Sequence, residues 1–137
     1  MKIFTNGCFD LLHIGHIELL KYSKSLGDYL VVGINSDNSI KKLKGHNRPI
    51  NNEYTRKLIL ESIRYVDEVI IFDEQTPLEL IKKIQPHIIV KGGDYKKEEV
   101  VGYEFEKLNL LEVKIFNYVE NNSTTLTIER IKNDLRI

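Results

Sequence analysis

Two histidines flanking a glycine stand near the start of the chain. The stretch FDLLHIGH places His13 and His16 three residues apart, with Gly15 between them. Residues at this spacing share one face of a helical turn, so both imidazoles can point at the same ligand. The N–H groups at a helix start attract an anion, and glycine lets the backbone approach it closely. We therefore expect phosphate chemistry at these residues.

Two other interpretations of the histidine pair remain open at this point. Histidines at this spacing could lie on the surface, which would be the usual outcome for an isolated pair, or they could bind a metal. A structural zinc site needs four ligands, and the other candidates, Cys8, His46 and His87, do not have the required spacing. We therefore expect no metal site built from protein side chains.

The composition limits the class of protein. The 137 residues, of which 42% are apolar, suit one domain over 1–137, and the 20 basic and 20 acidic residues cancel. Net neutrality gives no reason to expect a nucleic acid or an anionic membrane as partner. The single cysteine cannot form an internal disulfide, the start MKIFTNGCFD lacks a signal peptide's apolar run, and no stretch approaches the ~20 residues of a membrane span. We expect a cytoplasmic location.

Strand-like and helix-like segments alternate along the chain. Apolar β-rich runs predict strands at 2–5, 29–34, 69–72, 86–90 and 113–116. Apolar spacing predicts helices at 15–25, closed by Gly27, and at 53–63, with later helices opened by Thr76-Pro77 and by Ser123, and a long polar loop at 35–52. This order predicts a single α/β domain, a Rossmann-like doubly wound parallel five-stranded sheet with helices on both faces.

Polar segments follow the predicted strands at one end of this sheet, where ligands of such folds bind. They are residues 6–10, 35–37, 91–95 and 123–125. Each also has a simpler interpretation: a glycine turn at 92–93, a helix cap at 123, and a packing role for Cys8. Asp10 could cap the first helix or contact the substrate. Because these segments converge, we expect a ligand pocket there.

Basic residues gather on the polar segment 35–52 and just after it. A run of lysines is usually solvated, but a loop of this length in a compact domain is often functional. Cations on it could close over a triphosphate. The candidates are Lys41, Lys42, Lys44, Arg48 and Arg56, of which we favour Lys44 and Arg56.

These motifs resemble the HxGH nucleotidyltransferases. The resemblance rests on TNGCFDLLHIGH, SLGDYLVVGINSD and the late STT, and it covers nearly the whole chain. HIGH also occurs in class I aminoacyl-tRNA synthetases, which are much larger and carry tRNA-binding regions. Within the family, INSDNSIKKLKGHNRPI and TPLELIKKIQPHIIVKGGDY are similar to the domain that makes ADP-heptose from heptose 1-phosphate and ATP. GDYLVVGINSD and RKLILESIRYVDEVI are close to glycerol-3-phosphate cytidylyltransferase.

Two departures favour the heptose type. The cytidylyltransferase carries Arg-Thr-x-Gly before its STT and a Gly-Asp-Asp-Trp segment, where this chain has no arginine at 118–123 and Gly-Gly-Asp-Tyr at 92–95. Residues 120–122, Glu-Asn-Asn, also differ from the Asp-Gly-Cys usual in the heptose type. Bifunctional heptose enzymes carry a sugar kinase domain as well, and this chain has none, so we expect a stand-alone transferase.

The resemblance implies nucleotidyl transfer. A phosphate oxygen of a small phosphorylated sugar or polyol attacks the α-phosphorus of an NTP, ATP or CTP, and pyrophosphate leaves. The expected product is an ADP-heptose-type nucleotide sugar for lipopolysaccharide or capsule, made by a homodimer with Mg²⁺ on the triphosphate. The alternatives are CDP-glycerol synthesis, a nucleotide sensor without chemistry and a structural interaction module.

The resemblance also assigns roles to residues. The catalytic residues would be His13, His16 and Lys44, and the acceptor substrate would meet Asp10, Asp37 and Arg56. The nucleotide would be bound by Asn6, Gly7, Cys8, Phe9, Gly15, Lys91, Gly92, Gly93, Asp94, Tyr95, Ser123, Thr124 and Thr125.

Overall fold

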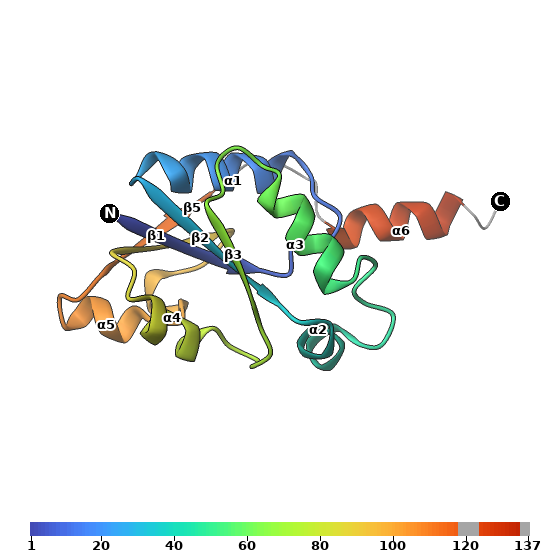
Figure 1. Ribbon diagram of the computed structural model, residues 1–137. Helices are drawn as coiled ribbons and strands as arrows, with labels where there is room; N and C mark the ends of the chain where they lie inside the picture. Colours follow the sequence, from blue (N-terminus) through green and yellow to red (C-terminus); the bar gives the residue numbers. More distant parts are fainter. Residues whose placement is uncertain (118–123, 135–137) are drawn as a thin grey trace.

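A five-stranded parallel sheet forms the centre of the computed structural model, which describes residues 1–117 and 124–134 and, of Thr124 and Thr125, the backbone alone (Figure 1). The strands are β1 (Lys2–Gly7), β2 (Tyr29–Asn35), β3 (Glu68–Phe72), β4 (Ile88–Gly92) and β5 (Glu112–Phe116). Their spatial order is β3-β2-β1-β4-β5, and every neighbouring pair is parallel. The predicted Rossmann-like α/β fold is confirmed.

Helices cover both faces of the sheet. They are α1 (Ile14–Ser25), α2 (Asp37–Lys44), α3 (Glu53–Glu61), α4 (Leu78–Ile84), α5 (Tyr103–Lys107) and α6 (Thr124–Asp134), with a 3₁₀ turn at Lys97–Glu99. Figure 1 shows α1 and α3 on one face, α4 and α5 on the other, and α6 projecting away from the sheet. None of the helices in the described part is long and apolar enough to cross a membrane.

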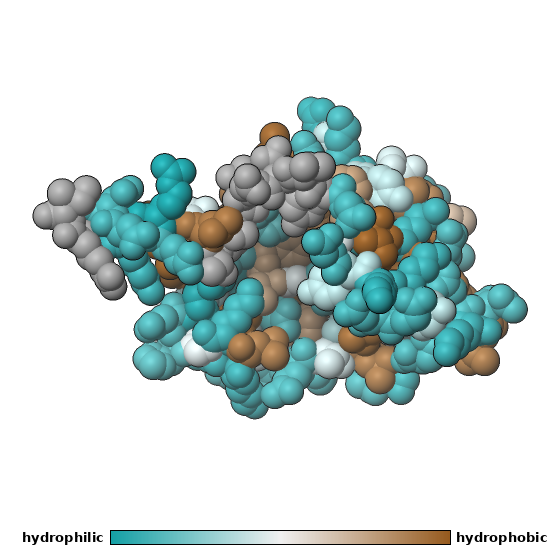
Figure 2. Space-filling model, turned by 180° about the vertical axis from the view of Figure 1, so that it is seen from behind, coloured by the Kyte–Doolittle hydropathy of each residue, from teal (hydrophilic) through white to brown (hydrophobic). Residues whose placement is uncertain are grey.

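The hydrophobic core has two layers, one on each face of the sheet. Successive residues of a strand point to opposite faces, so Ile3 packs with Leu20 of α1, whereas Phe4 packs with Ile81 of α4. Burial on both faces explains why the strands read as continuous apolar runs. In the view of Figure 2, hydrophilic side chains cover most of the surface and hydrophobic ones are scattered among them.

The composition of the polar segment 35–52 predicts a loop, but the structure shows that the segment contains α2. The Ser36 hydroxyl caps this helix by accepting the backbone N–H of Ser39 at 3.1 Å. Ile40 is buried, and the lysines of α2 lie on its exposed side. A short helix that buries so few apolar residues has too weak a periodicity to predict. The loop is therefore confined to 45–52.

Some predicted helix ends also need correction. Thr76 does not cap α4 and Pro77 is not its first residue, because the helix begins at Leu78 and Pro77 precedes it without a side-chain cap. The helix α1 ends at Ser25, and its C-cap residue is Leu26 rather than Gly27. A glycine is required at position 27 for a steric reason, because a Cβ there would lie 2.5 Å from the carbonyl oxygen of Met1. The 3₁₀ turn and α5 were not predicted.

Candidate active site

His13 and His16 build the N-terminal cap of α1. His13 is the N-cap residue, and its Nδ1 accepts the backbone N–H of Gly15 at 3.1 Å. The Nδ1 of His16 accepts the backbone N–H of His13 at 3.2 Å. The ring centroids are 4.0 Å apart, so the two imidazoles lie side by side at the helix start. The expectation that they share one face agrees with this geometry.

The cap fixes the tautomer of both imidazoles. A neutral imidazole has one donor nitrogen and one acceptor nitrogen. Because Nδ1 is the acceptor in His13 and in His16, the neutral form of each ring carries its proton on Nε2. Two N–H donors are thereby oriented by backbone hydrogen bonds rather than by flexible side-chain contacts.

His16 stays uncharged at neutral pH. Burial, the nearby His13 and Lys44, in that order of importance, together lower the pKa of its imidazole from 6.5 to about 4. The buried ring of Phe9 contributes to this environment, with its centroid 5.4 Å from that of His16. Phe9 was expected to bind nucleotide, and in the structure it packs against the catalytic candidate.

The loop between β1 and α1 is strained and firmly anchored. Phe9 and Leu11 have φ angles of 50° and 44°, a left-handed conformation that non-glycine residues rarely adopt and that often marks functional sites. The Asp10 carboxylate, only 2% exposed, accepts the backbone N–H groups of Ile50 at 2.6 Å and Asn51 at 3.0 Å. Asp10 is therefore not the cap of α1, one of its two expected roles.

Arg56 holds the segments around the site together. Its side chain is 1% exposed, and its guanidinium donates to the carbonyl oxygens of Cys8, Asn35 and Asn51 at 2.8–3.0 Å. Its Nη2 pairs with an Asp37 carboxylate oxygen at 2.9 Å. Four of its five N–H donors are used within the protein, and the expectation that Arg56 meets a substrate phosphate stays a prediction. Asp37, also expected to contact substrate, is engaged by Arg56.

A cavity of about 410 Å³ opens at the carboxyl ends of β1, β2 and β4. It brings together six of the predicted residues: Asn6, Gly7, Cys8, Lys44, Lys91 and Tyr95. Its other walls are Asn35, Leu43, Gln75, Thr76, Pro77, Glu99, Val100 and Val101. Three of the four polar segments expected to converge at this end of the sheet, 6–10, 35–37 and 91–95, therefore contribute to one cavity.

Lys91 is the most desolvated cation in this cavity. Burial lowers the pKa of its ammonium, and Lys44 lowers it further, whereas Cys8 acts in the opposite direction. Its Nζ lies 5.0 Å from the centroid of the Tyr95 ring, within the range of a cation–π contact. Lys44 and Lys91 both line the cavity, and Lys91 is poorly solvated, so their positive charges favour an anionic ligand.

Sequence reasoning missed the wall formed by Gln75 and Thr76. The Ser36 hydroxyl bonds the Asp73 carboxylate at 2.5 Å, and the Ser39 hydroxyl bonds the Glu74 carbonyl at 3.1 Å, so α2 holds this segment in place. The signal was available, because residues 73–77 follow the predicted strand 69–72 just as the other polar segments follow theirs. Thr76 had been interpreted as a helix cap instead.

Of the remaining residues predicted to bind the nucleotide, some do not line the cavity and others lie outside the residues that the structure describes. Gly15 is buried in the first turn of α1, Gly92 ends β4, and Gly93 turns the chain with a φ of 110°. Asp94 is exposed. Ser123 lies outside the described residues, and Thr124 and Thr125 begin α6, with no side-chain description.

No group of three or more His, Cys, Asp or Glu side chains within the described ranges could hold a metal ion. A Mg²⁺ ion that arrives with a nucleotide takes ligands mainly from phosphate oxygens and water, and such an ion does not need a protein cluster.

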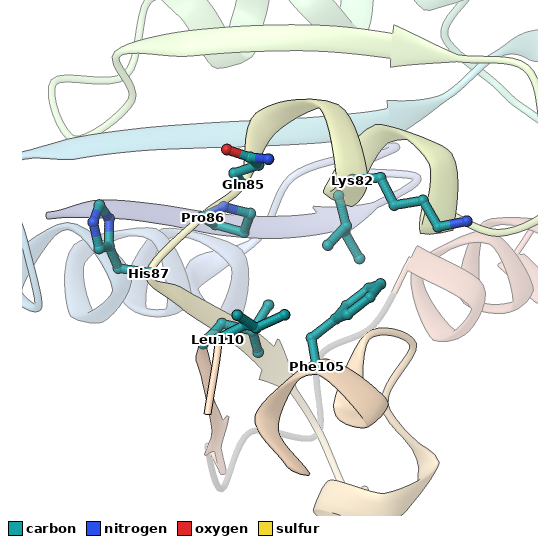
Figure 3. A pocket seen from close by; sticks show the side chains of 8 residues that line it. Lys82, Gln85, Pro86, His87, Phe105 and Leu110 are labelled. Carbon is teal, nitrogen blue, oxygen red and sulfur yellow. The ribbon is translucent and has the colours of Figure 1, made fainter. Parts of the chain in front are cut away.

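A second cavity, of about 550 Å³, lies at the amino end of β4 between α4 and α5. Figure 3 shows Lys82, Gln85 and Pro86 on one side of it and Phe105 and Leu110 on the other. It contains none of the predicted site residues, and it lies at the opposite end of the sheet from His13 and His16.

Known proteins resemble this chain over most of its length. A sequence model of the cytidylyltransferase-like family matches residues 4–130. The bifunctional protein HldE of Nitratiruptor sp. is 53% identical over 130 residues, which are 95% of this chain and 27% of the relative. That of Campylobacter concisus is 54% identical, again over 95% of this chain and 27% of the relative. The chain thus spans about a quarter of the length of these curated relatives.

Solved structures show the same fold. The lipopolysaccharide core biosynthesis protein from Thermoplasma volcanium is 30% identical with a TM-score of 0.69, and the match covers 89% of this chain and 98% of that one. A pantothenate synthetase from Thermus thermophilus matches with a TM-score of 0.56 at 15% identity, over 85% of this chain and 54% of that one. The second likeness shows a common fold.

Proposed function

The chain belongs to the cytidylyltransferase-like family and is a nucleotidyltransferase, and from that premise we propose that it transfers AMP from ATP to heptose 1-phosphate. The products would be pyrophosphate and an ADP-heptose-type nucleotide sugar. The motifs KLKGHNRP and VKGGDY, which resemble the ADP-heptose-forming domain, support this acceptor. The likeness to a lipopolysaccharide core biosynthesis protein supports it too.

The observation that carries the proposal is the pair of Nε2–H donors at the start of α1. In the proposed reaction, a phosphate oxygen of the sugar attacks the α-phosphorus of ATP, and the bond to pyrophosphate breaks on the opposite side. The attacking phosphate is already an anion, so no general base is needed. Catalysis then depends on alignment and on donors aimed at the oxygens that gain charge. His13 and His16 would donate to these oxygens.

Two lysines would complete the charge balance. Lys44 and Lys91 line the cavity of about 410 Å³, and Lys44 is near enough to His16 to lower the pKa of its imidazole. The two ammonium groups would neutralise the phosphates. Mg²⁺ would enter with the triphosphate and offset part of its charge. The start of α6 would contribute backbone N–H groups to the phosphates, as helix starts do elsewhere. Polar side chains in the walls of the cavity, among them Asn6, Asn35 and Gln75, suit a small hydroxylated molecule.

Pyrophosphate release tests the proposal directly. ATP, CTP and GTP would each be incubated with heptose 1-phosphate and with glycerol 3-phosphate. We expect turnover only with ATP and heptose 1-phosphate. Turnover with CTP and glycerol 3-phosphate would replace the proposal by CDP-glycerol synthesis, to which RKLILESIRYVDEVI is similar. Nucleotide binding without turnover of any pair would indicate a sensor.

A further inference from the structure

Arg48 is a mostly buried cation whose charge is only partly compensated. Its side chain is 14% exposed, and its Nε is buried without a hydrogen-bond partner among the described residues. The nearest carboxylate oxygen, Oδ2 of Asp10, lies 4.0 Å from this nitrogen, which is beyond hydrogen-bond length. A guanidinium has five N–H donors, so Arg48 can still bind an acceptor.

Asp10 forms only a long ion pair with Arg48, at 4.0 Å, and its two oxygens also serve another purpose. They accept the backbone N–H groups of Ile50 and Asn51. These bonds attach the loop 45–52 to the segment that leads into His13. The carboxylate therefore fixes where Arg48 stands without forming a close ion pair with it.

Comparison with Arg56 shows how unusual this is. Arg56 is buried as well, but it donates four hydrogen bonds, to three carbonyl oxygens and to Asp37. The same fold thus contains one arginine with four of its five donors satisfied by the protein and one whose buried Nε has no hydrogen-bond partner among the described residues. A desolvated guanidinium with unused donors matches a phosphate group, whose oxygens can accept two parallel N–H bonds.

We propose that Arg48 is a phosphate-binding residue that holds a phosphate group of one reactant beside the histidine pair. This inference rests on the proposed nucleotidyl transfer. It singles out Arg48 from the cations predicted from the sequence, because Arg56 has fewer donors left for a ligand. The phosphate could belong to the triphosphate or to the acceptor sugar, since both present the same anionic oxygens, and binding measurements separate these sources.

The test is calorimetric titration of the wild type, R48M and R48K with Mg·ATP, inorganic pyrophosphate and heptose 1-phosphate, each alone. Loss of charge-assisted hydrogen bonds should weaken binding of the cognate ligand by about 10- to 100-fold in R48M. R48K should bind more weakly than the wild type, because an ammonium cannot offer two parallel donors. K83M removes an exposed cation of α4 and should bind like the wild type.

The outcomes separate the two proposals. Weaker binding of Mg·ATP or pyrophosphate assigns Arg48 to the nucleotide, and weaker binding of heptose 1-phosphate assigns it to the acceptor. Equal binding of all three ligands by R48M and the wild type, within twofold, would overturn the inference. If R48M does not fold, R48K decides by the same criteria. If R48M loses Mg·ATP affinity while the wild type makes no product from heptose 1-phosphate, Arg48 keeps its role and the proposed acceptor fails.

Discussion

The Nδ1 atom of His16 accepts the backbone N–H of His13 at 3.2 Å, and this bond couples the cap of α1 to the chemistry of the site. It leaves the proton of a neutral His16 on Nε2. Burial, together with His13 and Lys44, keeps the pKa of His16 at about 4, so this neutral tautomer dominates near pH 7. A structural hydrogen bond therefore prepares a donor for a phosphate oxygen.

Replacing His16 should separate these two roles. His16→Ala should lower turnover by about 10²–10³-fold, the scale for losing one preorganised donor. His16→Asn should lower turnover to a similar degree but keep more stability, since its amide oxygen can take the place of Nδ1 in the cap. Steady-state kinetics and thermal unfolding measure both effects. Turnover of His16→Ala within a few-fold of the wild type would contradict the assigned role.

The lowered pKa of His16 should make the protein less stable in mild acid. The unfolded chain binds a proton at this residue near pH 6.5, whereas the folded protein resists it down to about pH 4. The contribution of His16 to the free energy of unfolding is therefore fully present above pH 6.5. It falls as the pH drops from 6.5 to 4, by up to about 3 kcal/mol. Urea unfolding at several pH values measures it, and His16→Gln should flatten the slope across this interval. An unchanged slope in that variant would refute the linkage.

Arg56→Met should lower the free energy of unfolding rather than change the KM for a substrate. The substitution leaves three buried carbonyl oxygens and the Asp37 carboxylate without their donor. Removing one partner of a buried charged pair costs about 3–5 kcal/mol, and denaturant unfolding would detect this. Lys83→Met is the control for loss of one positive charge. A normally stable Arg56→Met protein with a raised KM for a phosphate substrate would restore the direct role first expected for Arg56.

Apolar periodicity and the strand-end rule were enough to predict the sheet and the position of the site. The continuous apolar run at 29–34 predicts a strand covered on both faces, and the structure places it beside β1. The same logic located Lys91 and Tyr95 at the cavity. Whether a segment is a helix or a strand, and where a strand ends, depends on neighbouring residues in the chain, so a single sequence is enough to predict both.

Roles that depend on contacts distant in sequence could not be predicted. Arg56 and Arg48 look alike as basic residues near one loop, but only the fold decides which guanidinium meets Asn35 and Asp37. The hydrogen bonds from Asp10 join residues 40 and 41 positions apart, so its part in anchoring the loop has no local pattern. In α2, burial of Ile40 stabilises a helix that its lysine-rich sequence does not reveal.

Lys44→Met should raise the pKa of His16 toward 6.5. Lys44 is one cause of the lowered pKa of that imidazole, after burial and His13, so the shift should be upward and smaller than the effect of burial. An NMR titration of the His16 ring proton measures it. Lys42→Met is the matched control, because Lys42 lies on the same helix and is not among the groups that lower this pKa. Turnover of Lys44→Met should also fall, by about 10- to 100-fold, because a cation that offsets phosphate charge is lost. A pKa that falls, or one that Lys42→Met raises equally, would mean that Lys44 does not act on His16 and would remove it from the catalytic set.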